Sequence, residues 1–248
     1  MRELDKRPSG PARWLLHPAA PYLALGAVLL ALHAQLTLGT GDDPMYASIL
    51  EGYSLWGFSV MHYYTWSART LIEAVLCVAE ALPTLLWRLA DPALIALCAY
   101  WGARVLGCER DAKAGWALAG LVLSYDWTAM RTAGWVCTTL VFVWPLAAAL
   151  TAVQPLVTAR RGGRVPRWAY APCALLALYA ANMEQLMVGL LLCLLALLGY
   201  DLFTKRRPAG FLWVLLAACG ANALYAATCP GTAARMAGET TSWFIDFG

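Results

Sequence analysis

Asp42 and Asp43 are adjacent carboxylates that follow the first apolar segment of the chain. Carboxylates serve as general bases and as ligands for metals or polar substrates, and ionisable residues close to a bilayer usually have a function. A pair at the mouth of a membrane-spanning segment is placed to take a proton from a substrate at the membrane surface. Asp42 and Asp43 are therefore the first candidates for a catalytic site.

The same residues also fit a purely structural interpretation. Asp42-Asp43-Pro44 suits a turn that caps a helix beginning at Met45, because aspartate is a good N-cap and proline is favoured in the first helical turn. The sequence leaves both interpretations open.

The composition indicates the class of protein that must position these acids. Of the 248 residues, 61% are hydrophobic and only 13% are charged, and twelve are tryptophan. This is too little polar surface to cover a soluble fold of this length. We predict an all-α polytopic membrane protein.

Apolar runs of roughly spanning length define the expected helices, since about 20 residues cross a hydrocarbon core of about 30 Å. Seven such runs are predicted to cross, the fifth being short; they cover residues 20–38, 91–107, 114–130, 138–157, 168–182, 185–203 and 210–228. An eighth run, 70–87, carries two glutamates and a proline. Arg69, Glu73 and Glu80 share one helical stripe there, which favours a helix lying on the membrane.

The distribution of basic residues favours the same topology. If 70–87 lies in the outer interface, fourteen of the eighteen lysines and arginines fall on the N-terminal side of the membrane. Basic residues concentrate in cytoplasmic loops. We therefore expect a cytoplasmic N-terminus (1–19), seven spans, a first outer loop (39–90) with a juxtamembrane helix, and an outer C-terminal segment (229–248). These parts form a single predicted domain, 1–248.

Several short motifs, in their order along the chain, resemble the bacterial integral-membrane glycosyltransferases of the GT-C superfamily. They are GDDPMY after the first span, then YYTWSAR, AGWVCTTLVFVWP, NMEQ, CPGTAARM and TSWFIDF. The likeness is to a poorly characterised branch with an Asp-Asp pair in the first loop. Two departures are Ala68, where glycine is commoner, and Thr232, where asparagine is usual. The chain is shorter than most members, which suggests a truncated or minimal form.

The resemblance implies roles for individual residues. Asp42 or Asp43 would deprotonate the acceptor hydroxyl, and Arg69 or Arg235 would stabilise charge on the departing lipid phosphate. The further expected substrate-binding residues are Trp66, Asn182 and Glu184. Because these groups must reach one sugar-phosphate, the Asp pair should share an outward-facing cavity with Arg69 and with Glu184 or Arg235. In the structural alternative, Arg69 pairs only with Glu73 and Glu184 is solvated at the bilayer edge.

The resemblance also implies the reaction. The donor would be a polyprenyl-phosphate-linked sugar, and the acceptor a glycan, lipid or protein of the cell envelope at the outer face of the plasma (inner) membrane. No cofactor and no nucleic acid are expected, and a divalent metal stays open. The alternatives are a catalytically inactive membrane scaffold and a transporter or flippase component for lipid-linked sugars. No nucleotide-binding glycine-rich loop accompanies the basic loops.

Overall fold

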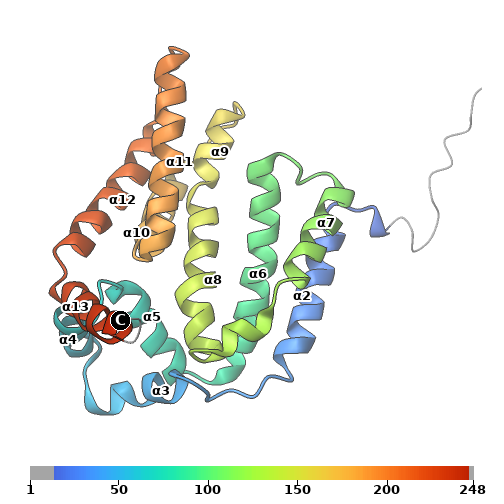
Figure 1. Ribbon diagram of the computed structural model, residues 1–248. Helices are drawn as coiled ribbons and strands as arrows, with labels where there is room; N and C mark the ends of the chain where they lie inside the picture. The colour runs from blue at the N-terminus through green and yellow to red at the C-terminus, as the bar shows by residue number, and fades with distance from the viewer. Residues whose placement is uncertain (1–13, 246–248) are drawn as a thin grey trace, which may run out of the picture. The chain divides into compact units, whose positions relative to one another are not determined.

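The computed structural model describes residues 14–245, with side chains up to residue 237. Every regular element in this part of the chain is helical (Figure 1). The contacts divide the chain into two compact units, one formed by 1–36 and 88–127, the other by 37–87 and 128–248. Helix α6 (Thr84–Leu106) contains the second boundary between them. Of the final motif TSWFIDF, only the last two residues, Asp246 and Phe247, lie outside the described residues.

The first unit contains α2 (Ala20–His33), most of α6 and α7 (Ala112–Leu123). Helices α2 and α7 pack closely, because Gly115 has no side chain. A Cβ atom at this position would lie 2.9 Å from Pro21 Cγ and 3.2 Å from the Tyr22 hydroxyl. A small residue at such a contact brings helix backbones together, as is common between membrane helices.

The second unit begins with three short helices in the region predicted as the first outer loop. These are α3 (Asp43–Gly52), α4 (Leu55–Thr65) and α5 (Thr70–Ala81). Ser54 begins α4 by accepting a hydrogen bond from Gly57 N at 3.1 Å, an ordinary N-cap. Pro83 separates α5 from α6, so the predicted run 70–87 is divided between two helices.

Five further helices of this unit form a bundle: α8 (Trp135–Ala152), α9 (Gln154–Arg160), α10 (Tyr170–Ala181), α11 (Glu184–Phe203) and α12 (Gly210–Ala227). The last helix, α13 (Pro230–Ile245), packs against α4 instead, and 3-10 turns lie at Trp127–Arg131 and Arg167–Ala169. The core between α9, α10, α11 and α12 is rich in alanine and cysteine as well as leucine. These small side chains allow close packing without a large aromatic core.

Within the described residues, four helical segments are long and apolar enough to cross a membrane: Thr84–Leu106, Trp135–Arg160, Glu184–Phe203 and Gly210–Ala227. They correspond to four of the predicted spans. The other three runs form α2, with 14 residues, and α7 and α10, with 12 residues each. These three fall short of about 20 residues. Seven crossing helices therefore stay a prediction, whereas a helical chain with several membrane-compatible segments is confirmed.

Candidate functional site

The two predicted catalytic aspartates lie in different environments. Asp42 is exposed and occupies the position before α3, but its side chain accepts no capping hydrogen bond there. Asp43 is only 2% exposed, and its Oδ1 accepts a hydrogen bond from Cys137 N at 3.0 Å. Because Cys137 lies in the first turn of α8, Asp43 caps α8 rather than its own helix. The helix expected after the pair does form, with Asp42 at its N-cap position, but the side-chain capping bond is made by Asp43 to α8 and not by Asp42 to α3.

A glycine holds this arrangement together. Gly134 precedes α8 with φ 96° and ψ 146°, and a Cβ atom there would lie 2.1 Å from Asp43 Oδ1. In addition, Asp42 N donates to the carbonyl of Ala133 at 3.0 Å. The GDD segment is thus fixed against the start of α8 by a hydrogen bond to its backbone and by a contact that only glycine permits.

Glu80 completes the environment of Asp43. This side chain of α5 is half-buried and within hydrogen-bonding reach of the Asp43 carboxylate; burial, followed by the Asp43 charge, raises the pKa of Glu80 to about 8. Asp43 Oδ2 and Glu80 Oε1 are buried without a hydrogen-bond partner among the described residues. With a pKa of about 8, Glu80 holds its proton at neutral pH beside the Asp43 carboxylate.

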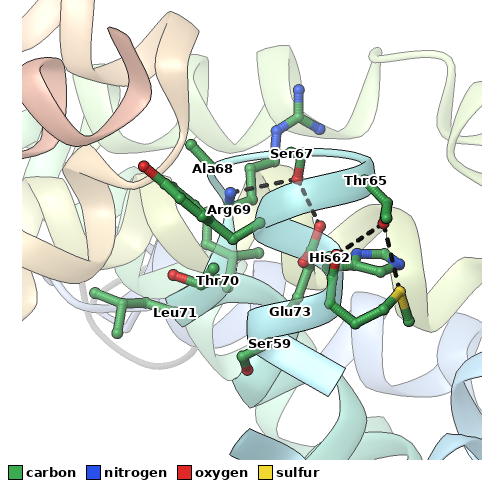
Figure 2. A network of polar contacts seen from close by, with 12 residues as sticks. Ser59, His62, Thr65, Ser67, Ala68, Arg69, Thr70, Leu71 and Glu73 are labelled. Atoms are coloured by element: carbon green, nitrogen blue, oxygen red, sulfur yellow. Dashed lines mark hydrogen bonds and ion pairs between the residues drawn. The ribbon is translucent and has the colours of Figure 1, made fainter. Parts of the chain in front are cut away.

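Glu73, about two turns before Glu80, is the centre of a second polar cluster, shown in Figure 2. Its Oε2 lies 2.9 Å from His62 Nδ1, and its Oε1 accepts a hydrogen bond from Ser67 Oγ at 2.7 Å. Only 4% of Glu73 is exposed. Burial and the negative charge of Glu73 together raise the pKa of the neighbouring Tyr46.

The acidic stripe of α5 thus faces the protein. Glu73 and Glu80 point to polar partners, whereas Leu71 and Val78 are exposed. Sequence reasoning placed these glutamates on a membrane-surface helix and did not include them, or His62, among the site residues. The signal was present in the spacing of the stripe, but periodicity does not reveal whether a polar face meets water or other side chains.

Arg69 and Glu184 come together across a long stretch of chain. Arg69 Nε donates to Glu184 Oε2 at 2.8 Å, and the two side chains are 19% and 27% exposed. Arg69 therefore does not pair with Glu73 one turn further along α5. The contact joins the beginning of α5 to the beginning of α11.

Asn182 fixes the same junction. Its Oδ1 accepts hydrogen bonds from Leu71 N at 2.9 Å and Ile72 N at 3.2 Å, while its Nδ2 donates to Ala68 O at 2.9 Å. Asn182 thus satisfies free backbone groups at the start of α5, as an N-cap residue does. Because its side chain is fully engaged with these backbone groups and with Asn222 Oδ1, to which Nδ2 donates at 3.2 Å, Asn182 positions the site rather than offering a free ligand.

The C-terminal motif lies on the end of α4. The guanidinium carbon of Arg235 is 5.3 Å from the centre of the Trp66 ring, a cation–π contact. Gly231 packs so closely that a Cβ atom would lie 2.3 Å from Trp66 N, and Cys229 Sγ donates to Tyr63 O at 3.0 Å. Figure 1 shows α13 beside α4 accordingly.

The candidate residues thus form two groups. Trp66, Arg69, Asn182, Glu184 and Arg235 gather at the beginning of α5, whereas Asp42 and Asp43 lie near its end, beside Glu80. Twelve residues of helix separate these ends by about 18 Å. A cavity shared by the two groups stays a prediction.

Two further observations concern ligands and relatives. Nowhere in residues 14–237 do three His, Cys, Asp or Glu side chains meet in an arrangement that could hold a metal ion. No family model, curated protein or solved structure matches the chain. The glycosyltransferase resemblance therefore rests on the residues of the short motifs and on their order.

Proposed function

We propose that this protein is a membrane glycosyltransferase that moves a sugar from a polyprenyl-phosphate donor to a cell-envelope acceptor at the outer membrane face. The observation that carries the proposal is the meeting of three separated motifs at one place. YYTWSAR, NMEQ and CPGTAAR contribute Arg69, Glu184, Trp66 and Arg235 to the beginning of α5. The shared position is what a substrate site assembled from these motifs requires.

The two arginines supply the phosphate-binding chemistry. Glu184 contacts Arg69 through Nε, which leaves the two terminal nitrogens of the guanidinium for an anion. Arg235 lies over the ring of Trp66. Trp66 precedes Arg69 by three residues, and both belong to the connection between α4 and α5. The aromatic ring would pack against a sugar or isoprenoid while both cations face the phosphate.

The transfer step follows from these assignments. The acceptor hydroxyl loses its proton to a carboxylate base, and its oxygen forms a bond to the anomeric carbon from the face opposite the phosphate. The bond between that carbon and the phosphate oxygen breaks, and polyprenyl phosphate leaves with the electron pair. Arg69 and Arg235 stabilise the additional negative charge on the phosphate.

Asp42 is the base that we assign from the first-loop pair. Its carboxylate is exposed to a substrate, whereas that of Asp43 is buried and occupied by the start of α8. The His62–Glu73 pair is the alternative base, since Glu73 holds the imidazole through Nδ1 and lies closer along α5 to Arg69. Because a base must lie within hydrogen-bonding reach of the attacking hydroxyl, Asp42 can act only if the loop that carries it closes toward the beginning of α5 when substrate binds, whereas His62 already lies there.

The experiment measures the transfer of labelled sugar from polyprenyl-phosphate donors by the purified protein in liposomes, with envelope extract as acceptor. We expect transfer by the parent and a loss of about 10²–10⁴-fold in Asp42→Asn, the range for a general base. Glu51→Gln removes an exposed acid from the same helix and should keep the parental rate.

Three outcomes would change the proposal. Loss of transfer in His62→Gln but not in Asp42→Asn would assign the base to the histidine pair. Retained transfer in Arg69→Gln and Arg235→Gln would contradict the proposal that these arginines bind the donor phosphate. A folded parent that uses no lipid donor would contradict the enzyme proposal and favour the scaffold.

A further inference from the structure

A small polar pocket lies where α9 ends and the connection from α11 to α12 passes it. Its lining consists of Ala159, Arg160, Asp201, Arg206, Arg207 and Ala209, and its volume is about 140 Å³. A water molecule takes up about 30 Å³ in the liquid. The pocket thus holds a group larger than water, and three of its six lining residues are arginines.

One of the three arginines is neutralised within the pocket. Arg160 Nη1 lies 2.7 Å from Asp201 Oδ1 and 2.9 Å from Oδ2, and Asp201 is only 1% exposed. Arg206 and Arg207 are exposed, and neither forms an ion pair with an acid in the described part of the chain. Three positive charges and one negative charge leave the pocket with two positive charges.

The geometry of the connection holds the arginines in place. Arg206 N donates to Asp201 O at 2.8 Å, which closes the end of α11. The guanidinium groups of Arg160 and Arg206 both lie over the Tyr200 ring, at 5.8 and 6.0 Å from its centre. Cation–π contacts of this kind keep the two side chains near each other despite their like charge.

The neighbourhood of the pocket is apolar. Leu202 and Phe203, at the end of α11, are 62% and 89% exposed, and Trp213 in the first turn of α12 is 54% exposed. Both α11 and α12 are long and apolar enough to cross a membrane. A pocket in their short connection lies at the level of the lipid phosphates, and exposed aromatic and aliphatic side chains beside it suit acyl chains.

We propose that this pocket binds the phosphate of an anionic phospholipid in the bilayer. Two uncompensated arginines supply bidentate donors for phosphate oxygens. The first amides of α12, which follow Ala209 without a side-chain cap, add donors at the positive end of the helix dipole. The site does not depend on the proposed transferase activity, because it uses none of the residues assigned to that reaction.

The test compares phospholipid binding to the purified protein by native mass spectrometry and by titration in detergent. Phosphatidylglycerol should bind more tightly than zwitterionic phosphatidylcholine. The double variant Arg206→Gln/Arg207→Gln should weaken phosphatidylglycerol binding by about 10- to 30-fold, since each arginine near an anionic surface contributes about 1 kcal/mol. Arg206→Lys/Arg207→Lys should keep part of the preference.

The matched control is Arg164→Gln/Arg167→Gln, which removes two exposed arginines outside the pocket. It should change phosphatidylglycerol binding by less than about twofold, whereas an equal loss in the two double variants would contradict a specific site. Equal affinity of the parent for both lipids would also overturn the proposal. If inorganic phosphate or glycerol phosphate displaced the lipid at the same concentration as phosphatidylglycerol, the ligand would be a soluble phosphate instead.

Discussion

Asp43 and Asp201 are both almost completely buried, yet the protein compensates their charges in opposite ways. Asp201, 1% exposed, has both carboxylate oxygens within 2.9 Å of one guanidinium nitrogen of Arg160. Asp43, 2% exposed, faces the Cys137 amide and a second carboxyl group, Glu80. One acid is paired with a cation, whereas the other lies between a helix start and the carboxyl group of Glu80, whose pKa is raised to about 8.

The difference separates a structural acid from a responsive one. The Arg160 guanidinium offsets the charge of Asp201, and the environment of this acid is fixed as long as the pair persists. Glu80, with a pKa of about 8, loses its proton just above neutral pH, so the charge beside Asp43 changes there. Asp43 belongs to the predicted catalytic loop, whereas Asp201 anchors the connection that forms the arginine pocket.

Asp91 in the first unit follows the pattern of Asp201. It is 0% exposed and lies 2.9 Å from His33 Nε2, while His33 Nδ1 lies 2.8 Å from Leu29 O. Arg88 also donates to His33 O and Leu36 O. This acid, inside a membrane-compatible helix, is therefore compensated locally.

The largest effect should come from breaking the Arg160–Asp201 pair. Arg160→Met leaves a buried aspartate without its cation, and we expect a loss of about 3 kcal/mol in the free energy of unfolding. Removing both charges in Arg160→Met/Asp201→Leu should restore most of this loss. Denaturant unfolding in detergent micelles gives both values, and a double variant as unstable as the single one would contradict the compensation argument.

The next largest loss of stability should come from replacing Gly134, whose missing side chain leaves room for the Asp43 carboxylate. Gly134→Ala places a side chain where Asp43 Oδ1 lies and where the backbone has φ 96°. We expect a loss of about 1–3 kcal/mol from the backbone conformation alone. Gly189→Ala, in α11 with open space around it, is the matched control and should be neutral or stabilising. A stable Gly134→Ala protein would mean that Asp43 does not need its contact with α8.

A smaller effect distinguishes the capping role of Asp43 from its charge. Asp43→Ala removes the acceptor for Cys137 N, and we expect a loss of about 1–2 kcal/mol. Asp43→Asn keeps an acceptor and supplies an amide donor to Glu80, so its loss should be smaller and the pKa of Glu80 should fall. Equal destabilisation by both substitutions, measured by the same unfolding assay, would show that the charge matters more than the cap.

The sequence predicted the helical membrane class because composition and the length of apolar runs can be read without knowing which residues pack together. It also selected residues that the fold brings together, such as Arg69 with Glu184 and Trp66 with Arg235. It could not predict that Asp43 would cap α8, because residues 43 and 137 are far apart in the chain and depend on packing. Nor could it identify the partners of Glu73 and Glu80, since a polar stripe looks the same facing water or protein.

The last prediction concerns the proton held by Glu80 and is a change of stability with pH. Burial and the Asp43 charge raise the pKa of Glu80 from an ordinary value of 4.5 to about 8. Between these values the folded protein binds more protons than the unfolded chain, so the free energy of unfolding falls as pH rises through this window. The slope due to Glu80 stays below about 1.4 kcal/mol per pH unit, the limit for one proton.

Glu80→Gln keeps a donor for Asp43 but cannot ionise, and should flatten the slope between pH 5 and 8, whereas Glu51→Gln should leave it unchanged. The free energy of unfolding, measured across this pH range, tests the prediction. A Glu80→Gln protein with the parental slope would contradict a raised pKa of Glu80 in the folded protein.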